Sequence, residues 1–244
     1  MSVIEAKGVS KSYPHAAERM LLRSYIARLF QRREANPFRA LRDISFCVEE
    51  GESVAVVGRN GAGKSTLLSL IAGVSEPTQG TVSVNGRVAA LLELGSGFHP
   101  DLTGRENMRL NASLLGLGRR ETDRLMPAII EYSGVGEFMD EPLRTFSTGM
   151  MVRLAFAVAI HVDPRIVIVD EVLAVGDAAF QAKCRDSLNK LRREGRTLLF
   201  VSHSSEEVLR VCDRAIWLEK GQMMMEGAAP DVIAAYEADL ESRR

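Results

Sequence analysis

A glycine-rich stretch limits what this chain can fold into more than any other part of the sequence. The segment VVGRNGAGKSTLL (residues 56–68) places three glycines within six residues, directly before Lys64. Glycine permits sharp backbone turns and a close approach of backbone N–H groups to a ligand. Residues 53–57 read as a buried strand and residues 67–72 as a helix. This strand, loop and helix order predicts a loop whose N–H groups surround the phosphates of a nucleoside triphosphate.

We expect this P-loop to bind the triphosphate through both backbone and side chains. Lys64 is expected to reach the terminal phosphates, and the hydroxyl of Ser65 to bind Mg²⁺. The cofactors predicted from this segment are therefore a nucleoside triphosphate and Mg²⁺. The predicted nucleotide-binding residues of the loop are Gly58, Asn60, Gly61, Ala62, Gly63, Lys64, Ser65 and Thr66.

A second motif supplies the carboxylates that nucleotide hydrolysis requires. In IVIVDE (residues 166–171), four apolar residues are followed by two acids. Asp170 is expected to bind Mg²⁺, and Glu171 to orient or deprotonate the attacking water. Taken alone, the pattern is equally consistent with a strand that ends in two solvated acids. The P-loop earlier in the chain favours the catalytic interpretation.

Composition excludes several other classes of function. A net charge of −1 and a pI near 6.5 give no overall attraction to nucleic acid or anionic lipid. Cys47, Cys184 and Cys212 have no metal or redox spacing, so we interpret them as reduced thiols of a cytosolic protein. The N-terminus is too polar for a signal peptide, and the longest apolar run, residues 154–160, is too short to cross a membrane. Any function at a membrane would be carried out from its surface.

The first third of the chain has strand patterns. Residues 3–13 and 40–49 alternate between apolar and polar side chains, which predicts strands of a partly exposed antiparallel sheet. We expect residues 81–94 to extend that sheet. After Thr103 the apolar spacing becomes helical up to about residue 160, which predicts a helical lobe.

The remaining patterns predict a parallel core. Residues 166–169 and 197–201 are short apolar runs typical of buried parallel strands, joined by a helix over residues 178–193. Residues 217–227 predict a hairpin that turns at Lys220-Gly221, and residues 230–240 a closing helix. The fold class is therefore α/β.

Two further segments narrow the class. FSTGMMVRLAFAVAI (residues 146–160) resembles the signature helix of ATP-binding cassette (ABC) proteins, in which a Ser-x-Gly stretch begins a helix. The resemblance implies that Ser147, Thr148 and Gly149 bind a phosphate of the ATP held by a second copy of the chain. A helix N-terminus suits that role because its first N–H groups lack partners within the helix. TLLFVSH resembles the family's switch strand and implies that His203 lies near the γ-phosphate.

The resemblance covers residues 3–227 and assigns three more positions. Tyr13 corresponds to the aromatic residue that stacks on adenine, with an ordinary strand-end tyrosine as the alternative. Asp177 corresponds to the aspartate that communicates across the dimer. The family's glutamine between the β lobe and the helical lobe is absent, and Glu93 is the nearest polar candidate for a contact with Mg²⁺ or water.

The sequence also departs from the common family pattern. Thr148 and Met150 stand where the signature usually has Gly and Gln, and residues 174–176 differ from the commoner Ser-Ala-Leu. With these departures, the segments 91–107, 146–159 and 170–180 look like those of the ATPase subunits of bacterial polysaccharide exporters, which move O-antigen, capsule and teichoic acid chains. The chain ends directly after the predicted closing helix, and so resembles the short forms without a C-terminal carbohydrate-binding domain.

The resemblance implies a fold and a function. The fold is an ABC nucleotide-binding domain over residues 1–244, with a mainly parallel core sheet, an antiparallel β lobe and an inserted helical lobe at about residues 103–160. The function is that of an ATPase that dimerises on ATP and powers export of a lipid-linked polysaccharide through membrane permease subunits. We expect it to lie peripherally at the cytoplasmic face of the bacterial inner membrane. The glycan would be contacted only indirectly, and no nucleic acid partner is expected.

Other P-loop functions fit the sequence less well. An ABC-type ATPase that acts as a nucleotide-gated clamp usually carries two cassettes or a long coiled-coil insertion, and neither is visible in this sequence. A GTPase is disfavoured because the single Asn-Lys pair, Asn189-Lys190, is not followed by the aspartate that would read guanine.

Residues 14–38 fit no standard cassette. Apolar side chains there recur at i, i+4 spacing among many arginines, which predicts a basic amphipathic helix. Two interpretations remain open: the helix lies against the inner leaflet or a permease loop, or it packs on its own β lobe with a solvated basic rim. The apolar positions are Leu21, Leu22, Tyr25, Ile26, Leu29 and Phe30.

Overall fold

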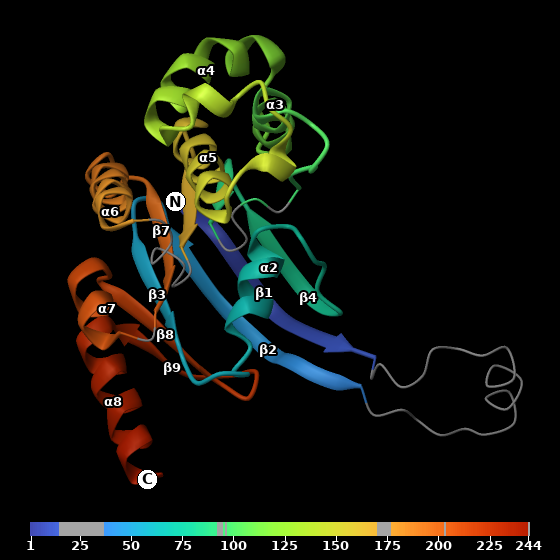
Figure 1. Cartoon of the computed structure of the whole chain (residues 1–244). Coiled ribbons are helices and arrows are strands. Elements are labelled where there is room, and N and C mark those ends of the chain that lie inside the picture. The colour runs from blue at the N-terminus through green and yellow to red at the C-terminus, as the bar shows by residue number, and fades with distance from the viewer. Residues whose placement is uncertain (15–36, 92–94, 96, 170–176, 203, 244) are drawn as a thin grey trace, which may run out of the picture.

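The computed structural model describes residues 1–14, 37–91, 95, 97–169, 177–202 and 204–243. These residues form two β-sheets, with a helix between the sheets and further helices on one outer face (Figure 1). All but the ends of the predicted helix at residues 14–38 lies outside this described part.

The smaller sheet has three antiparallel strands in the order β2-β1-β4. They are β1 (Ser2–Tyr13), β2 (Phe38–Glu49) and β4 (Gln79–Val84). Alternate residues of β2 are buried because one face of the sheet packs on the core and the other meets solvent. The antiparallel strands predicted at residues 3–13 and 40–49 are confirmed.

The larger sheet has the order β5-β6-β7-β3-β8-β9. Its three central strands are buried along their whole length, as their continuous apolar runs predict. All its neighbouring strands are parallel except β8 and β9, which form an antiparallel hairpin. The strands are β3 (Ser53–Val57), β5 (Val88–Ala90), β6 (Ile166–Val169), β7 (Thr197–Val201), β8 (Arg214–Glu219) and β9 (Gln222–Ala228).

One strand prediction is wrong. We expected residues 81–94 to extend the antiparallel sheet, but only β4 does so. After Gly86, which has φ 131°, the chain leaves that sheet, and β5 pairs in parallel with β6, with Val88 opposite Ile166. Ala89 and Leu91 are 1% exposed, and both pack into the apolar cluster that lies under the helices. Alternation of side chains predicts a strand but does not specify which sheet it joins.

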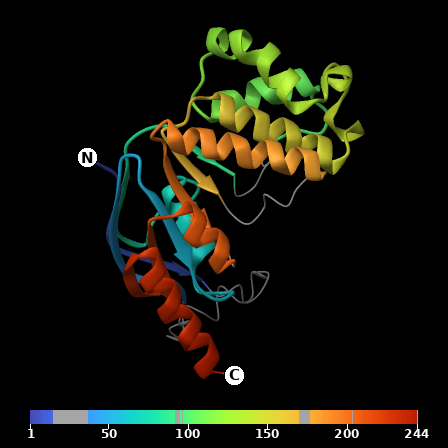
Figure 2. The same ribbon diagram turned by 90° about the vertical axis from the view of Figure 1, so that its left-hand side faces the viewer.

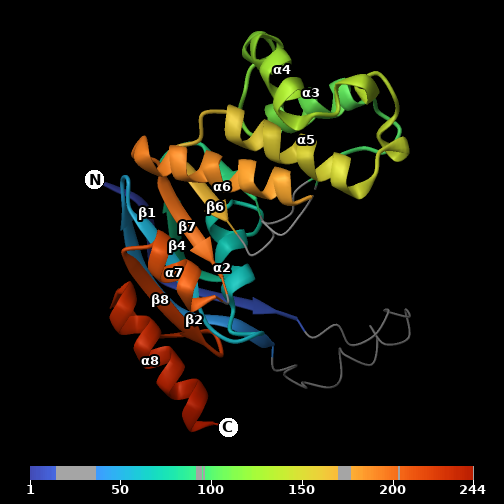
Figure 3. The same cartoon turned by 60° about the vertical axis from the view of Figure 1, so that its left-hand side comes forward.

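Helices cover both faces of the larger sheet. On β3, Val54 and Val56 face one cluster with the leucines of α2 (Lys64–Ile71), and Ala55 and Val57 face a second cluster on the other side. α2 therefore lies between the two sheets (Figure 1). Figure 3 shows the opposite face, where the outer helices lie. These are α5 (Thr148–His161), α6 (Ala178–Arg193), α7 (Ser205–Val211) and α8 (Ala229–Ser242).

Two more helices stand with α5 at one end of the molecule (Figure 2). α3 (Gly104–Leu114) and α4 (Arg119–Ser133) share a separate apolar core with α5. Thr103 is the N-cap of α3: its backbone N–H donates to Glu106 Oε2 at 2.8 Å, and Glu106 N donates to Thr103 Oγ1 at 3.3 Å. These two hydrogen bonds form a capping box. The pKa of the Glu106 carboxyl is lowered because the carboxylate accepts hydrogen bonds from the backbone N–H and from the hydroxyl of Thr103. Two short 3₁₀ helices, Gly136–Phe138 and Leu143–Thr145, lead into α5.

The β8–β9 hairpin turns at Lys220 and Gly221, as predicted, with φ 48° and 78°. Its register shifts by one residue, because Trp217 pairs with Met225 and Leu218 with Met223. Met223 and Met225 consequently pack into the two different apolar clusters. The run of methionines therefore fills space on both sides of an irregular strand, which is a use that suits this flexible side chain.

Burial accounts for the chemistry of two of the three cysteines. Cys184 and Cys212 are buried, which raises the pKa of each thiol to about 12, so both are protonated at neutral pH. Cys47 is exposed, and all three are free. Within the described ranges, no helix has the length and apolar character needed to cross a membrane.

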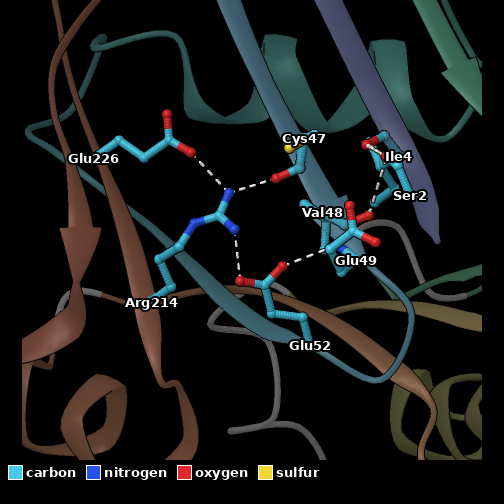
Figure 4. A network of polar contacts seen from close by, with 8 residues as sticks. All are labelled: Ser2, Ile4, Cys47, Val48, Glu49, Glu52, Arg214 and Glu226. Atoms are coloured by element: carbon cyan, nitrogen blue, oxygen red, sulfur yellow. Dashed lines mark hydrogen bonds and ion pairs between the residues drawn. The ribbon is translucent and has the colours of Figure 1, made fainter.

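Arg214 joins the two sheets at the edge where β3 and β8 begin (Figure 4). Its guanidinium donates to Glu52 Oε1 at 2.6 Å, to Glu226 Oε1 at 2.7 Å and to the carbonyl oxygen of Cys47 in β2. Glu52 Oε2 also accepts a hydrogen bond from the backbone N–H of Glu49 at 2.9 Å. The side chains of Arg214, Glu52 and Glu226 are each less than one third exposed.

We expect Arg214→Ala to lower the free energy of unfolding by about 2 kcal/mol, because it leaves two partly buried carboxylates and a carbonyl without their donor. Urea denaturation measures this loss. Arg144→Ala is the matched control, since Arg144 pairs with Asp101 at 2.6 Å but both side chains are more than 60% exposed. That pair should contribute about 0.5 kcal/mol. Equal losses in the two variants would contradict the role given to Arg214.

Candidate nucleotide-binding site

The P-loop connects the end of β3 to the start of α2 by a path that requires glycine. Gly58 has φ 147°, and a Cβ there would lie 2.2 Å from the carbonyl oxygen of Leu218. Gly63 has φ 107° and is the N-cap residue of α2; a Cβ there would lie 2.8 Å from the carbonyl oxygen of Ala40. Both conformation and space therefore exclude a side chain at these two positions.

Lys64 lies inside the loop. Its side chain is buried, and its ammonium donates to the carbonyl oxygen of Gly58 at 2.6 Å and to that of Arg59 at 3.2 Å. These carbonyls hold the positive charge among the backbone groups of the loop. At the start of α2, which is wholly described, no side chain caps the helix and no acidic residue stands in the first turn. This helix N-terminus can therefore attract an anion.

Three strand ends meet beside the loop. β3, β6 and β7 are parallel, and their registers place Val56 opposite Val201 and Val169 opposite Phe200. Their carboxyl ends therefore lie at one edge of the sheet, which is where α/β folds place ligands. Asp170 directly follows β6 in the chain, and one residue separates His203 from the end of β7. Asp170, Glu171, His203 and Glu93 lie outside the described residues, so their roles stay predictions.

The predicted signature residues begin α5. Ser147 is its N-cap, and Ser147 Oγ accepts a hydrogen bond from Met150 N at 3.2 Å. Ser147 and Thr148 are exposed, and no hydrogen bond within the described part joins residues 147–149 to the P-loop. One copy of the chain therefore presents two separate helix N-termini, at α2 and at α5.

Asp177 is the N-cap of α6, where its Oδ1 accepts from Phe180 N at 2.8 Å. Its other carboxylate oxygen pairs with Arg153 of α5. The Arg153 guanidinium also lies 5.5 Å from the centre of the Phe180 ring. No local pattern in the sequence singles out Arg153, because the pair joins two helices.

Tyr13 ends β1 opposite Phe38, the first residue of β2. Both rings are exposed, by 40% and 54% respectively. Cross-strand partners lie on the same face of a sheet, so the two aromatic side chains are neighbours. The ammonium of Lys11 lies 5.2 Å from the centre of the Tyr13 ring. An exposed aromatic surface is thus present at the predicted adenine position.

Comparison with known proteins identifies the family. The ABC transporter family model matches residues 41–174, which include the P-loop and α5. The chain is also 50% identical to the "O-antigen export system ATP-binding protein RfbB" of Klebsiella pneumoniae, over 96% of this chain and 97% of that protein. The chain belongs to the ABC transporter family. It is an ABC-type ATPase, and ATP is its nucleotide.

Other relatives extend the comparison. The "Teichoic acids export ATP-binding protein TagH" of Listeria monocytogenes is 42% identical over 82% of this chain and 59% of its own length. A solved structure described as the ATP-binding subunit of an ABC transporter superposes with a TM-score of 0.74 at 25% identity, and covers 96% of this chain and 93% of that one. A dimeric cassette bound to ADP and Pi has a TM-score of 0.71 at 22% identity, with 93% and 98% covered. The predicted α/β ABC fold is confirmed.

Proposed function

We propose that this chain is the ATPase subunit of an exporter for lipid-linked polysaccharide. The observation that carries the proposal is the 50% identity, along nearly the whole of both chains, to an ATP-binding protein of O-antigen export. The teichoic acid relative supports the same substrate class. A nucleotide-gated clamp is not favoured, because the relatives reported above are export proteins.

The proposal places the ATPase as a homodimer at the cytoplasmic face of the bacterial inner membrane. Its other partners are integral-membrane permease subunits, which contact the glycan in its place. A genetic experiment tests this. Deleting the gene should remove the surface polysaccharide and leave its lipid-linked precursor inside the cell, and the wild-type gene should restore export. Normal surface polysaccharide in the deletion strain would refute the proposal.

We further propose that each ATP is held between two copies of the chain. The α2 N-terminus and Lys64 of one copy would bind the phosphates, and residues 147–149 of the other copy would bind the γ-phosphate. The N-terminus of α5 supports this, because Ser147 and Thr148 are exposed and no acidic residue stands in the first turn. Adding a ligand that both copies contact shifts the equilibrium toward the dimer.

Mg²⁺ fits the oxygen ligands that the chain offers. Ser65 is exposed on the first turn of α2, so its hydroxyl is accessible beside the phosphates. The proposed ligands are Ser65 and Asp170, with Glu93 as a third contact to the metal or its water. Bound Mg²⁺ would neutralise charge on the phosphates. Glu171 would take the proton of the water that attacks the γ-phosphorus as the bond to ADP breaks. His203 would lie near the γ-phosphate, Asp177 would communicate across the dimer, and Tyr13 would stack on the adenine.

Ser147→Ala is expected to weaken ATP-induced dimerisation roughly tenfold, because a hydrogen bond to a charged phosphate is worth about 1.5 kcal/mol or more. Analytical ultracentrifugation in a hydrolysis-deficient Glu171→Gln background measures the effect.

Thr103→Ala is the control for Ser147→Ala. Both substitutions remove an N-cap oxygen that accepts from the backbone N–H three residues later, at a cost of about 1 kcal/mol. Only the Ser147 variant should lose dimer affinity. A similar loss in both variants would mean that Ser147 acts through helix stability alone.

A further inference from the structure

Three backbone segments meet at the P-loop and are joined by backbone hydrogen bonds. They are the loop at Ala62, the hairpin turn at Gly221 and the beginning of β2. Gly221 N donates to the carbonyl oxygen of Ala62 at 2.9 Å, and Arg42 N donates to the carbonyl oxygen of Gly221 at 2.7 Å. The turn is therefore hydrogen-bonded to the P-loop on one side and to β2 on the other.

Two glycines face the same oxygen atom at this junction. A Cβ on Gly221 would lie 2.5 Å from the carbonyl oxygen of Ala40, and a Cβ on Gly63 would lie 2.8 Å from it. The Cβ on Gly63 would also come within 3.6 Å of Gly221 Cα. The three backbone segments consequently pack against one another directly, so a displacement of one would force the other two to move.

A β-bulge brings the Ala40 carbonyl into this position. Lys11 pairs with Leu41 and Ser12 with Arg39, which leaves Ala40 as the extra residue in β2. A bulge bends its strand and changes the direction of its backbone groups, and bulges are frequent beside active sites. Ala40 is 6% exposed, so the junction is a buried support of the loop.

We propose that Gly221 is a positioning residue for nucleotide binding. It fixes Ala62 and Gly63, and thereby the backbone N–H groups that precede Lys64, without contacting the nucleotide itself. The backbone N–H donors must lie about 3 Å from the phosphate oxygens that accept from them, so a shift of a fraction of an ångström at the loop weakens nucleotide binding. This inference rests on the phosphate-binding role proposed for the P-loop.

Gly221→Ala and Gly195→Ala form a matched pair for testing this. The two glycines have φ 78° and 77°, so alanine meets the same backbone cost at each, but a Cβ on Gly195 has no heavy atom within 4 Å. Titration with a fluorescent ATP analogue should give a Kd raised about tenfold for Gly221→Ala and within twofold of wild type for Gly195→Ala. The KM for ATP should rise similarly, with kcat changed less than threefold. Circular dichroism establishes that each variant is folded at the temperature used.

Folded Gly221→Ala that binds the analogue as wild type does would overturn the inference. Lys64→Ala, measured alongside, distinguishes failure of this inference from failure of the proposed phosphate site. If only Lys64→Ala loses binding, the positioning role of Gly221 is refuted and the site is not. If both variants bind as wild type does, the proposed site itself is refuted.

A second measurement decides the question if Gly221→Ala does not fold. Coupling between two sites is reciprocal, so nucleotide must stabilise the junction by as much as the junction favours nucleotide. Amide hydrogen exchange in the wild-type protein should slow about tenfold at Gly221 and Arg42 when Mg²⁺ and a non-hydrolysable ATP analogue are added. The Gly195 amide, which donates to Arg192 in the turn before β7, should be unaffected. Unchanged exchange at Gly221 and Arg42 would overturn the inference.

Discussion

Glu171→Gln is expected to slow ATP hydrolysis by about 10²- to 10⁴-fold and to leave ATP binding largely intact. Glutamine has the size of glutamate but cannot accept the proton of the attacking water at neutral pH. The ATP-bound state should then persist, and with it the dimer. Phosphate release measures the first effect, and size-exclusion chromatography with light scattering in ATP measures the second.

Glu194→Gln is a suitable control for the Glu171 variant. Glu194 is an exposed residue at the end of α6, where the same change of charge should leave hydrolysis unaltered. Hydrolysis at the wild-type rate by Glu171→Gln would show that another group is the base. A slow variant that stays monomeric in ATP would instead refute the two-copy site.

The parts of the fold with strong local signals were predictable from the sequence. The strands Ile166–Val169 and Thr197–Val201 and the helix Ala178–Arg193 have the predicted bounds. Continuous apolar runs can only be buried on both faces, and Asp177 supplies the N-cap that starts the helix. The P-loop was predictable for a related reason, because its glycines and Lys64 are needed at fixed spacing.

Features that depend on which segments meet could not be predicted in this way. β5 alternates as a strand of either sheet would, and its partner was assigned wrongly. The bulge at Ala40 leaves no mark in the sequence, because any residue can be the extra one. Gly221 has the sequence context of an ordinary hairpin glycine, and what distinguishes it is that a Cβ there would lie only 2.5 Å from the carbonyl oxygen of Ala40. The ion pair of Arg153 with Asp177 could not be predicted either, because it joins α5 to the start of α6.

Lys64→Ala is expected to weaken ATP binding roughly 10- to 100-fold, because a hydrogen bond to a charged group contributes about 1.5 to 3 kcal/mol. ATP hydrolysis should become undetectable at ordinary nucleotide concentrations. The Kd comes from titration with a fluorescent ATP analogue. Lys190→Ala, which removes an exposed lysine of α6, is the control and should bind as wild type does.

The structure also indicates how that loss should be interpreted. The Lys64 ammonium donates to the carbonyl oxygens of Gly58 and Arg59. An ammonium has three N–H donors, so phosphate oxygens would share it with these carbonyls, and the change in Kd measures the lysine–phosphate contact in their presence. The same carbonyls lose a donor in Lys64→Ala, which should lower the unfolding free energy by about 1 kcal/mol even in the absence of ATP. A variant that loses this stability but keeps its affinity for ATP would make Lys64 a structural residue of the loop and not a phosphate ligand.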